Sequence, residues 1–316
     1  MSWINMISWF FLFLSICFCF SSSNWFFLWI SLELNLLCFI FNSFKKNNIS
    51  ANSMFKYFII QSMSSLIFLF SMILLKNIEF FELNFFFISM AMYMKLGFPP
   101  FHFWLTDVGE GLDWLNFFIF NTIQKIIPLY IISFSMFFTN QMIILGAFLG
   151  SLMMFNQNSL RKILIFSGIT HMAWMLFIMK NNNTNWMLYL TIYSFSFYMF
   201  IYFNMKLNMS SSLQLMFFPS LFMNLLMILS FLNISGLPPF LGFFPKWLTM
   251  SYFNFNMSMS MTALILSSLL SCFIYINTIL PIMTNKITLK KKIIKNFNPF
   301  IILSTMFLFL LIPLIY

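Results

Sequence analysis

Long apolar segments, joined by short polar ones, run along almost the whole chain and limit what it can fold into. Of the 316 residues, 61% are hydrophobic and only 7% are charged. A helix needs about 20 apolar residues to cross a bilayer core, so the length allows about ten or eleven crossings and leaves little for a soluble domain. Because the segments are apolar on every face, they do not fit a transmembrane barrel, whose strands alternate. The sequence therefore predicts an all-α polytopic membrane protein.

Membrane-spanning helices can be located with windows of about 19 residues. The first apolar segment has no preceding basic residue and no small-residue cleavage pattern, so we interpret it as a span and not as a signal peptide. The predicted spans lie near residues 3–20, 25–43, 56–75, 83–105, 113–137, 141–156, 160–179, 186–204, 216–249, 258–281 and 296–316, which gives eleven helices.

The basic residues test this segmentation, because successive loops lie on alternating sides of a membrane. Odd-numbered loops contain only Lys76 and Lys180, and all the other loop lysines and the single arginine belong to even-numbered loops or their flanks. By the positive-inside rule, this bias places the N-terminus on the cytoplasm-like or matrix side and the C-terminus opposite. Since topology explains the net charge of +10, we expect no nucleic-acid partner. The basic residues of the even-numbered loops are Lys45, Lys46, Lys56, Arg161, Lys162, Lys206, Lys286, Lys290, Lys291, Lys292 and Lys295.

Four ionisable side chains remain inside predicted spans: Glu33, Lys95, Lys125 and Lys246. An ionisable residue at the membrane centre costs about 2.5–3.5 kcal/mol on insertion scales, so we expect these four to have functional roles. The alternative is that some form inert buried pairs or extend towards the headgroups, which is easiest for Lys246 near a helix end.

Two of the predicted spans contain a glycine followed by a double proline. A double proline removes two backbone donors and clashes with the preceding turn, so both spans are predicted to be broken helices that lie inside protein or beside water. Paired Gly/Pro interruptions of this kind indicate the ion path of a transporter. Two kinked helices that arose by chance are the alternative. The residues at the breaks are Gly97, Pro99 and Pro100 in the fourth span, and Gly236, Pro238 and Pro239 in the ninth.

The positions of the two breaks predict an internal repeat. The second break lies five helices after the first. Because five is an odd number, the second unit would enter the membrane from the opposite face. We therefore predict an antiporter-like inverted repeat of two five-helix units, residues 3–137 and 141–281, followed by a C-terminal helix at 296–316. The cysteines, in contrast, lie in apolar runs without ligand spacing and are interpreted as buried free thiols and not as a metal site. They are Cys17, Cys19, Cys38 and Cys272.

The sequence around both breaks resembles a known family. Residues 94–104 and 236–247 are similar to chain 2 of NADH:ubiquinone oxidoreductase, the respiratory complex I, and shorter matches occur at 32–35, 124–128, 158–162 and 171–175. The resemblance implies a multi-pass protein of the mitochondrial inner membrane, with a matrix N-terminus and an intermembrane-space C-terminus. It also implies the eleven-helix form of animals, which lacks three N-terminal helices of bacterial relatives. Abundant Phe and Met with a single Arg fit an A+T-rich mitochondrial genome.

The resemblance also implies roles for individual residues. Glu33, Lys95, Lys125 and Lys246 match the family's charged residues and would form a proton relay, and His171 either extends that relay or is a hydrogen-bonded structural histidine. We interpret His102 as structural. Three acidic residues near the first break, Asp107, Glu110 and Asp113, are interpreted as a solvated face.

A mechanism follows from the chemistry of these side chains. Burial disfavours the charged form of lysine and a nearby carboxylate favours it, so we expect Glu33 and Lys95 to form a switch whose separation releases a proton through water and Lys125 towards Lys246. The sequence has no dinucleotide fingerprint, iron–sulfur cysteine cluster or haem ligand pair. We therefore expect no cofactor in this chain, and the resemblance implies NADH, FMN, iron–sulfur clusters and ubiquinone in other subunits.

The resemblance further implies partners among the membrane-arm subunits, including chains 4 and 4L, together with accessory subunits. The lysine cluster at 290–295 indicates contact with anionic lipids such as cardiolipin. Two alternatives to a proton-carrying subunit of complex I stay open at this point. One is a subunit of a cation/proton antiporter with the same fold, and the other is a structural membrane subunit that conducts nothing.

Overall fold

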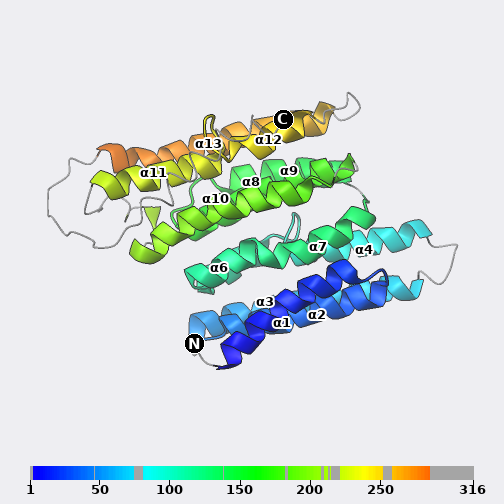
Figure 1. Cartoon of the computed structure of the whole chain (residues 1–316). Helices are drawn as coiled ribbons and strands as arrows, with labels where there is room; N and C mark the ends of the chain where they lie inside the picture. Colours follow the sequence, from blue (N-terminus) through cyan, green and yellow to red (C-terminus); the bar gives the residue numbers. More distant parts are fainter. Residues whose placement is uncertain are drawn as a thin grey trace. The chain divides into compact units, whose positions relative to one another are not determined.

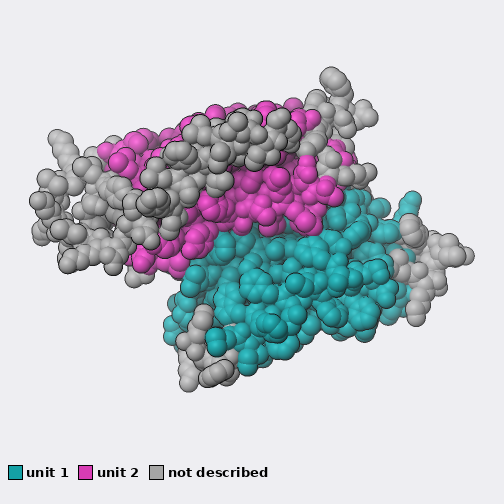
Figure 2. Space-filling view, in the orientation of Figure 1, with its two compact units in different colours: residues 1–142 teal, residues 143–316 magenta. Residues whose placement is uncertain are grey.

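The computed structural model confirms a mostly helical chain with broken helices. It describes residues 3–45, 47–74, 81–137, 139–181, 184–207, 210–212, 214, 221–251 and 258–284. The predicted helix at 296–316 lies outside the described residues, as do Lys46, Lys76, Lys286 and the cluster at 290–295. The chain divides into two compact units, residues 1–142 and 143–316 (Figure 2). We describe each unit by itself, and the inverted relation of the two predicted repeats stays a prediction.

Unit 1 is built from seven helices in the described part of the chain (Figure 1). In this unit α1 packs against α2, α3 packs against α4 and α5, and α7 contacts α2, α4 and α6. These helices are α1 (Trp3–Ser21), α2 (Trp25–Ser43), α3 (Asn48–Leu74), α4 (Phe81–Leu96), α5 (Phe103–Gly111), α6 (Trp114–Asn121) and α7 (Ile123–Phe134).

Helix α3 shows why this sequence packs well in lipid. Its buried face carries serines, together with Tyr57 and Gln61, whereas large apolar side chains such as Phe55 and Leu66 are exposed. The serines satisfy their hydroxyls locally, as when Ser64 donates to the carbonyl of Gln61 at 2.7 Å. Small and hydroxyl-bearing residues allow close helix contact in a membrane, where lipid solvates the apolar face. This face of α3, with its serines, Tyr57 and Gln61, is therefore directed into unit 1.

Unit 2 is organised around α9 (Leu160–Lys180), which is buried along nearly its whole length. Helix α9 contacts α10, α12 and α13, and α11 packs against α10 and α13. Helix α8 also approaches α9, because a Cβ atom at Gly150 would lie 2.9 Å from a methyl carbon of Thr170. The other helices are α8 (Thr139–Met153), which begins just before the boundary between the units, α10 (Trp186–Leu207), α11 (Leu221–Ser235), α12 (Phe243–Ser251) and α13 (Ser258–Thr284).

Both predicted helix breaks are confirmed. Helix α4 ends just before Gly97 and α11 just before Gly236, and the two glycines have positive φ values of 63° and 72°. This left-handed conformation commonly ends helices and favours glycine. The second break leaves no room for a side chain at Gly242, where a Cβ atom would overlap the carbonyl oxygen of Asn233. The Pro99–Pro100 and Pro238–Pro239 peptide bonds are cis.

A third interruption was not predicted. The predicted span at 113–137 divides at Thr122 into α6 and α7. The Thr122 hydroxyl donates to the carbonyl of Phe118 at 2.7 Å, and the Thr122 carbonyl accepts from Lys125 N–H at 3.2 Å, a three-residue step tighter than an α-helical turn. The sequence gives little sign of this, because a single threonine is compatible with an unbroken helix.

Six of the described helical segments are long and apolar enough to cross a membrane. The helices broken at Gly97 and Gly236, helix α8 and the part of α1 at Met6–Ser21 are not among these six, whereas the segment Trp114–Phe134, which contains the interruption at Thr122, is one of them. The predicted number of eleven spans is therefore not confirmed. The interpretation of the cysteines as buried was wrong for Cys17, which is exposed, and Cys272 is only partly buried, whereas Cys19 and Cys38 are buried. The physical reason is that an apolar residue of a membrane helix can face lipid, so apolar surroundings in the sequence do not imply burial in the protein.

Candidate functional site

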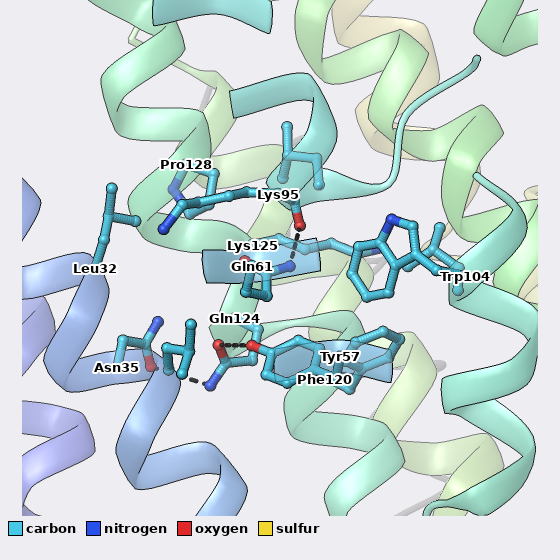
Figure 3. A pocket seen from close by; sticks show the side chains of 13 residues that line it. Leu32, Asn35, Tyr57, Gln61, Lys95, Trp104, Phe120, Gln124, Lys125 and Pro128 are labelled. Carbon is cyan, nitrogen blue, oxygen red and sulfur yellow. Dashed lines mark hydrogen bonds between the residues drawn. The ribbon is translucent and has the colours of Figure 1, made fainter. Parts of the chain in front are cut away.

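Two of the predicted lysines line one cavity in unit 1. Lys95 on α4 and Lys125 on α7 are only 6% and 5% exposed, and both reach a cavity enclosed by α2 to α7 (Figure 3). About 20 Å³ of this cavity can hold the centre of a water molecule, which is enough for at least one water. The cavity is also lined by Leu32, Asn35, Leu36, Tyr57, Gln61, Leu96, Trp104, Leu105, Phe120, Gln124 and Pro128.

The helix break places Lys95 at the cavity. Lys95 lies in the last turn of α4, where carbonyl groups have no intrahelical donor. Two of them are satisfied within the turn, since Gly97 N–H donates to Met94 and Phe98 N–H donates to Tyr93. The carbonyl of Lys95 itself accepts from the Gln61 side chain of α3 at 3.1 Å. The helix C-terminus carries partial negative charge, so this position stabilises an ammonium group.

Lys125 occupies the opposite kind of position. It lies in the first turn of α7, directly after the interruption at Thr122. The N-terminus of a helix carries partial positive charge, which disfavours a nearby cation. The two lysines that line this cavity therefore differ. The C-terminus of α4 favours the positive charge of Lys95, whereas the N-terminus of α7 disfavours that of Lys125.

A chain of polar side chains connects three helices beside the two lysines. The Tyr57 hydroxyl donates to Gln124 Oε1 at 3.1 Å, and Gln124 Nε2 donates to Asn35 Oδ1 at 3.0 Å (Figure 3). Together with Gln61, these side chains make one wall of the cavity polar. Sequence reasoning did not assign roles to these four residues. The available signal was the four-residue spacing of Tyr57 and Gln61, which puts both on one face of α3.

Glu33 on α2 lies beside this cavity without lining it. Its Oε1 atom is buried and has no hydrogen-bond partner in the described part of the chain. The carboxylate is close enough to Lys95 and Tyr57 to interact with both electrostatically. The ion pairs found among the described residues are instead half-exposed ones, Lys45–Asp113 and Lys56–Asp107, which agrees with a solvated acidic face.

Lys246 in unit 2 is held by the second helix break. It is 5% exposed, and its Nζ atom donates to the carbonyl of Ser235 at 2.7 Å. Ser235 is the last residue of α11, so the break at Gly236 makes this carbonyl available. The Cys272 thiol also donates to it at 3.2 Å. The side chain of Lys246 thus points back to the break instead of extending to a membrane surface.

The two histidines differ in their surroundings. His171 on α9 is buried, and its Nδ1 atom lies 2.8 Å from the Tyr189 hydroxyl. Its ring centroid lies 4.7 Å from that of Tyr193. His102, before α5, stacks on the Phe103 ring at 4.3 Å. The structure therefore surrounds His171 with tyrosines of unit 2, while Lys95 and Lys125 share the cavity of unit 1.

Known proteins resemble this chain in sequence and in fold. The family described as NADH:quinone oxidoreductase/Mrp antiporter, TM, matches residues 22–275. NADH-ubiquinone oxidoreductase chain 2 of Anopheles gambiae is 40% identical over 247 residues, which cover 72% of this chain and 70% of the relative. The corresponding chain of Artemia franciscana is 34% identical, with 85% and 87% covered. A chain of respiratory complex I from Thermus thermophilus has the same fold, with a TM-score of 0.80 at 16% identity and with 98% of this chain and 77% of that chain covered.

Proposed function

Because this chain belongs to the NADH-ubiquinone oxidoreductase chain 2 family, and is thus a membrane-arm, antiporter-like subunit of respiratory complex I, we propose that it carries protons across the mitochondrial inner membrane. The carriers are its buried lysines. The observation that supports this most directly is the cavity of unit 1, which Lys95 and Lys125 both line and which has room for water. The N-terminus lies in the matrix and the C-terminus in the intermembrane space, as the distribution of lysines favours.

The two lysines of the cavity differ in how well they hold a proton. Lys95 at a helix C-terminus favours its charged form and Lys125 at a helix N-terminus disfavours it. A proton released from Lys95 passes through cavity water to Lys125 when the field of Glu33 on Lys95 weakens. Its further path leads towards Lys246. The Tyr57, Gln124 and Asn35 side chains orient the water, since amides and hydroxyls both donate and accept.

The energy for this transfer comes from electron transfer in other subunits. NADH, FMN, iron–sulfur clusters and ubiquinone are expected there, and the lysine relay needs none of them in this chain. Neighbouring membrane-arm chains, such as chains 4 and 4L, accessory subunits and cardiolipin are the proposed partners. A change of position of Glu33 relative to Lys95 is the event through which those partners would act on this subunit.

A test replaces Lys125 with methionine in the assembled complex. Methionine keeps the length and apolar stem of the side chain but cannot carry a proton, so protons ejected per electron are expected to fall while NADH oxidation continues. Lys125→Arg should fail in the same way, because arginine does not release its proton in proteins. The half-exposed Lys56 offers a control, since Lys56→Met should leave the ratio unchanged.

The outcomes separate the proposed function from its two alternatives. An unchanged proton-to-electron ratio in Lys125→Met would favour a structural subunit that conducts nothing. A rescue by Lys125→Arg would mean that a fixed positive charge suffices and that no proton passes through this residue. The Mrp antiporters named with the matching family keep a cation/proton antiporter as the second candidate. Transport of Na⁺ or K⁺ against protons by the isolated chain in vesicles would favour it.

A further inference from the structure

One face of α3 contacts both of the segments that carry the lysines of the unit 1 cavity. Gln61 Nε2 donates to the carbonyl of Lys95 at 3.1 Å. The Tyr57 hydroxyl donates to Gln124 Oε1 at 3.1 Å, and Gln124 directly precedes Lys125 in α7. Tyr57 and Gln61 are four residues apart and lie on the same side of α3. A single helix face is therefore bonded to the end of α4 and to the beginning of α7 (Figure 3).

The bond from Gln61 replaces a donor that the first break removes. In a continuous helix the carbonyl of Lys95 would accept from the N–H four residues later. That residue is Pro99, which has no N–H. The Gln61 side chain supplies the missing donor from a neighbouring helix. The end of α4, and with it the backbone of Lys95, is thus held by α3.

The Tyr57 side chain is itself fixed in place. It is only 3% exposed, and its ring lies between aromatic rings of three other helices. Its centroid is 5.2 Å from that of Phe39 on α2, 5.9 Å from that of Trp104 on α5 and 6.1 Å from that of Phe120 on α6. These separations are typical of interacting aromatic pairs. The hydroxyl that binds Gln124 therefore has a defined position, from which it can hold the first turn of α7.

The small size of the cavity makes the separation of the two lysines important. A single water needs about 10–15 Å³ of space for its centre, and the cavity provides about 20 Å³. Proton transfer through one water requires each partner within about 2.6–3.2 Å of it. A misplacement of about 1 Å can slow a reaction about a hundredfold. A small shift of either helix end would therefore interrupt transfer between Lys95 and Lys125.

We propose that Tyr57 and Gln61 are positioning residues, which together set the separation of Lys95 and Lys125 across the cavity. The inference rests on the proposed function and adds the residues that fix its geometry. Gln61 acts on Lys95 through the backbone of α4, and Tyr57 acts on Lys125 through Gln124. Neither side chain carries the transported proton. Both act only through hydrogen bonds that hold two interrupted helices against one continuous helix.

The experiment compares Gln61→Leu and Tyr57→Phe with Lys125→Met in the assembled complex. Gln61→Leu removes the donor and keeps a similar size, and Tyr57→Phe removes one oxygen and keeps the ring contacts. Protons ejected per electron should fall in both variants towards the value of Lys125→Met. The ratio of proton-ejection rates in ordinary and heavy water should rise above that of the wild type, because a wider gap makes proton transfer limit the rate. A role in folding alone would lower the yield of complex and leave this isotope effect unchanged.

Two matched substitutions serve as controls. Tyr130 lies half-buried on α7, the same helix as Lys125, and does not line the cavity. Gln141 is exposed on α8. Tyr130→Phe and Gln141→Leu remove the same groups as the test variants, and both should keep the proton-to-electron ratio and the isotope effect of the wild type.

The possible outcomes distinguish the inference from the function on which it rests. If Lys125→Met lowers the ratio while Gln61→Leu and Tyr57→Phe keep both the ratio and the isotope effect, the positioning role is wrong and the lysine relay stands. If Lys125→Met keeps the ratio, the proposed function fails and the inference fails with it.

A density map of the wild-type complex gives a second measurement that does not depend on assembly of a variant. Gln61 is expected within hydrogen-bond distance of the Lys95 carbonyl, and the Tyr57 hydroxyl within hydrogen-bond distance of Gln124. A map in which either side chain is turned away from its partner would overturn the proposal.

Discussion

The two helix breaks use the same sequence motif but hold their lysines differently. At the first break, the freed carbonyl of Lys95 is satisfied by Gln61, and the Lys95 side chain is left to line a cavity. At the second break, the freed carbonyl of Ser235 is satisfied by the Lys246 side chain itself. The comparison teaches that a broken helix can either present a lysine to water or bind it. The first arrangement allows Lys95 to exchange a proton with water in the cavity. In the second, the hydrogen bond to Ser235 holds the ammonium group of Lys246 in place, and this bond must break before Lys246 can release that proton.

The largest expected effect concerns the tighter of the two breaks. A Cβ atom at Gly242 would overlap the backbone carbonyl of Asn233, which cannot move without the whole turn. At Gly97 a Cβ atom would meet only the Leu105 side chain, although the positive φ adds about 1–2 kcal/mol. We expect Gly242→Ala to destabilise by more than about 3 kcal/mol, the upper end of ordinary substitutions.

The measurement for this pair of variants is the yield of assembled complex, followed by its thermal unfolding. Gly97→Ala should assemble in larger amounts than Gly242→Ala. Equal yields would show that the two breaks are equally constrained, and the comparison between them would lose its structural basis.

A second prediction compares the stability of the Lys246→Met and Lys125→Met variants. Lys246→Met removes a donor from the buried carbonyl of Ser235, and an unsatisfied buried group costs about 1–3 kcal/mol. The remaining bond from Cys272 puts the expected loss near the lower end. Lys125→Met removes no described hydrogen bond of the ammonium group, so its unfolding temperature should stay closer to that of the wild type. A larger loss in Lys125→Met than in Lys246→Met would contradict the assigned roles.

The polar wall of the unit 1 cavity provides a third prediction. Gln124→Leu removes the partners of both Tyr57 and Asn35. Both groups can turn to cavity water, so we expect a loss of stability of about 1 kcal/mol and a reduced number of protons per electron. Unfolding midpoints and the proton-to-electron ratio test this together. A normal ratio with reduced stability would assign these side chains to folding alone.

The smallest effect is expected outside the cavity. Lys56→Ala removes the half-exposed ion pair with Asp107, whose Nζ–Oδ2 distance is 2.5 Å. Exposed ion pairs contribute about 0–1 kcal/mol and are screened by salt. The difference in stability from the wild type should therefore shrink as ionic strength rises. A large loss that persists in high salt would indicate that α3 and α5 depend on this pair for their packing.

The comparison also shows what the sequence can predict. The span positions and the two breaks follow from local rules, because apolar length, glycine and proline act on their own segment. The lysines inside spans can also be identified as candidate functional residues from the sequence, because the cost of placing a charge in the membrane does not depend on which neighbours the side chain contacts. The inverted relation of the repeats and the roles of the selected residues stay predictions.

The remaining features depend on contacts between segments distant in the chain. Gln61 is one amide in a serine-rich helix, and nothing nearby indicates that it caps the carbonyl of Lys95. The Ser235 carbonyl is a backbone group, so its bond to Lys246 has no residue signature. Tyr189 and Tyr193, which contact His171, resemble ordinary apolar positions of their helix. Such partners become visible only once α9 and α10 are placed together.

The close packing beside Gly236 limits which substitutions this protein can accept during evolution. A Cβ atom at residue 236 would come within 2.9 Å of Lys246 Nζ, so the ammonium group sits where a methyl group would otherwise go. Neither residue can be exchanged in isolation at little cost: a larger residue displaces the amine, and a lost amine leaves a void. We expect homologous sequences that keep this lysine to keep this glycine as well. Loss of the lysine alone would not free the position, because the positive φ and the Gly242 carbonyl oxygen, 2.8 Å from an added Cβ atom, still require glycine.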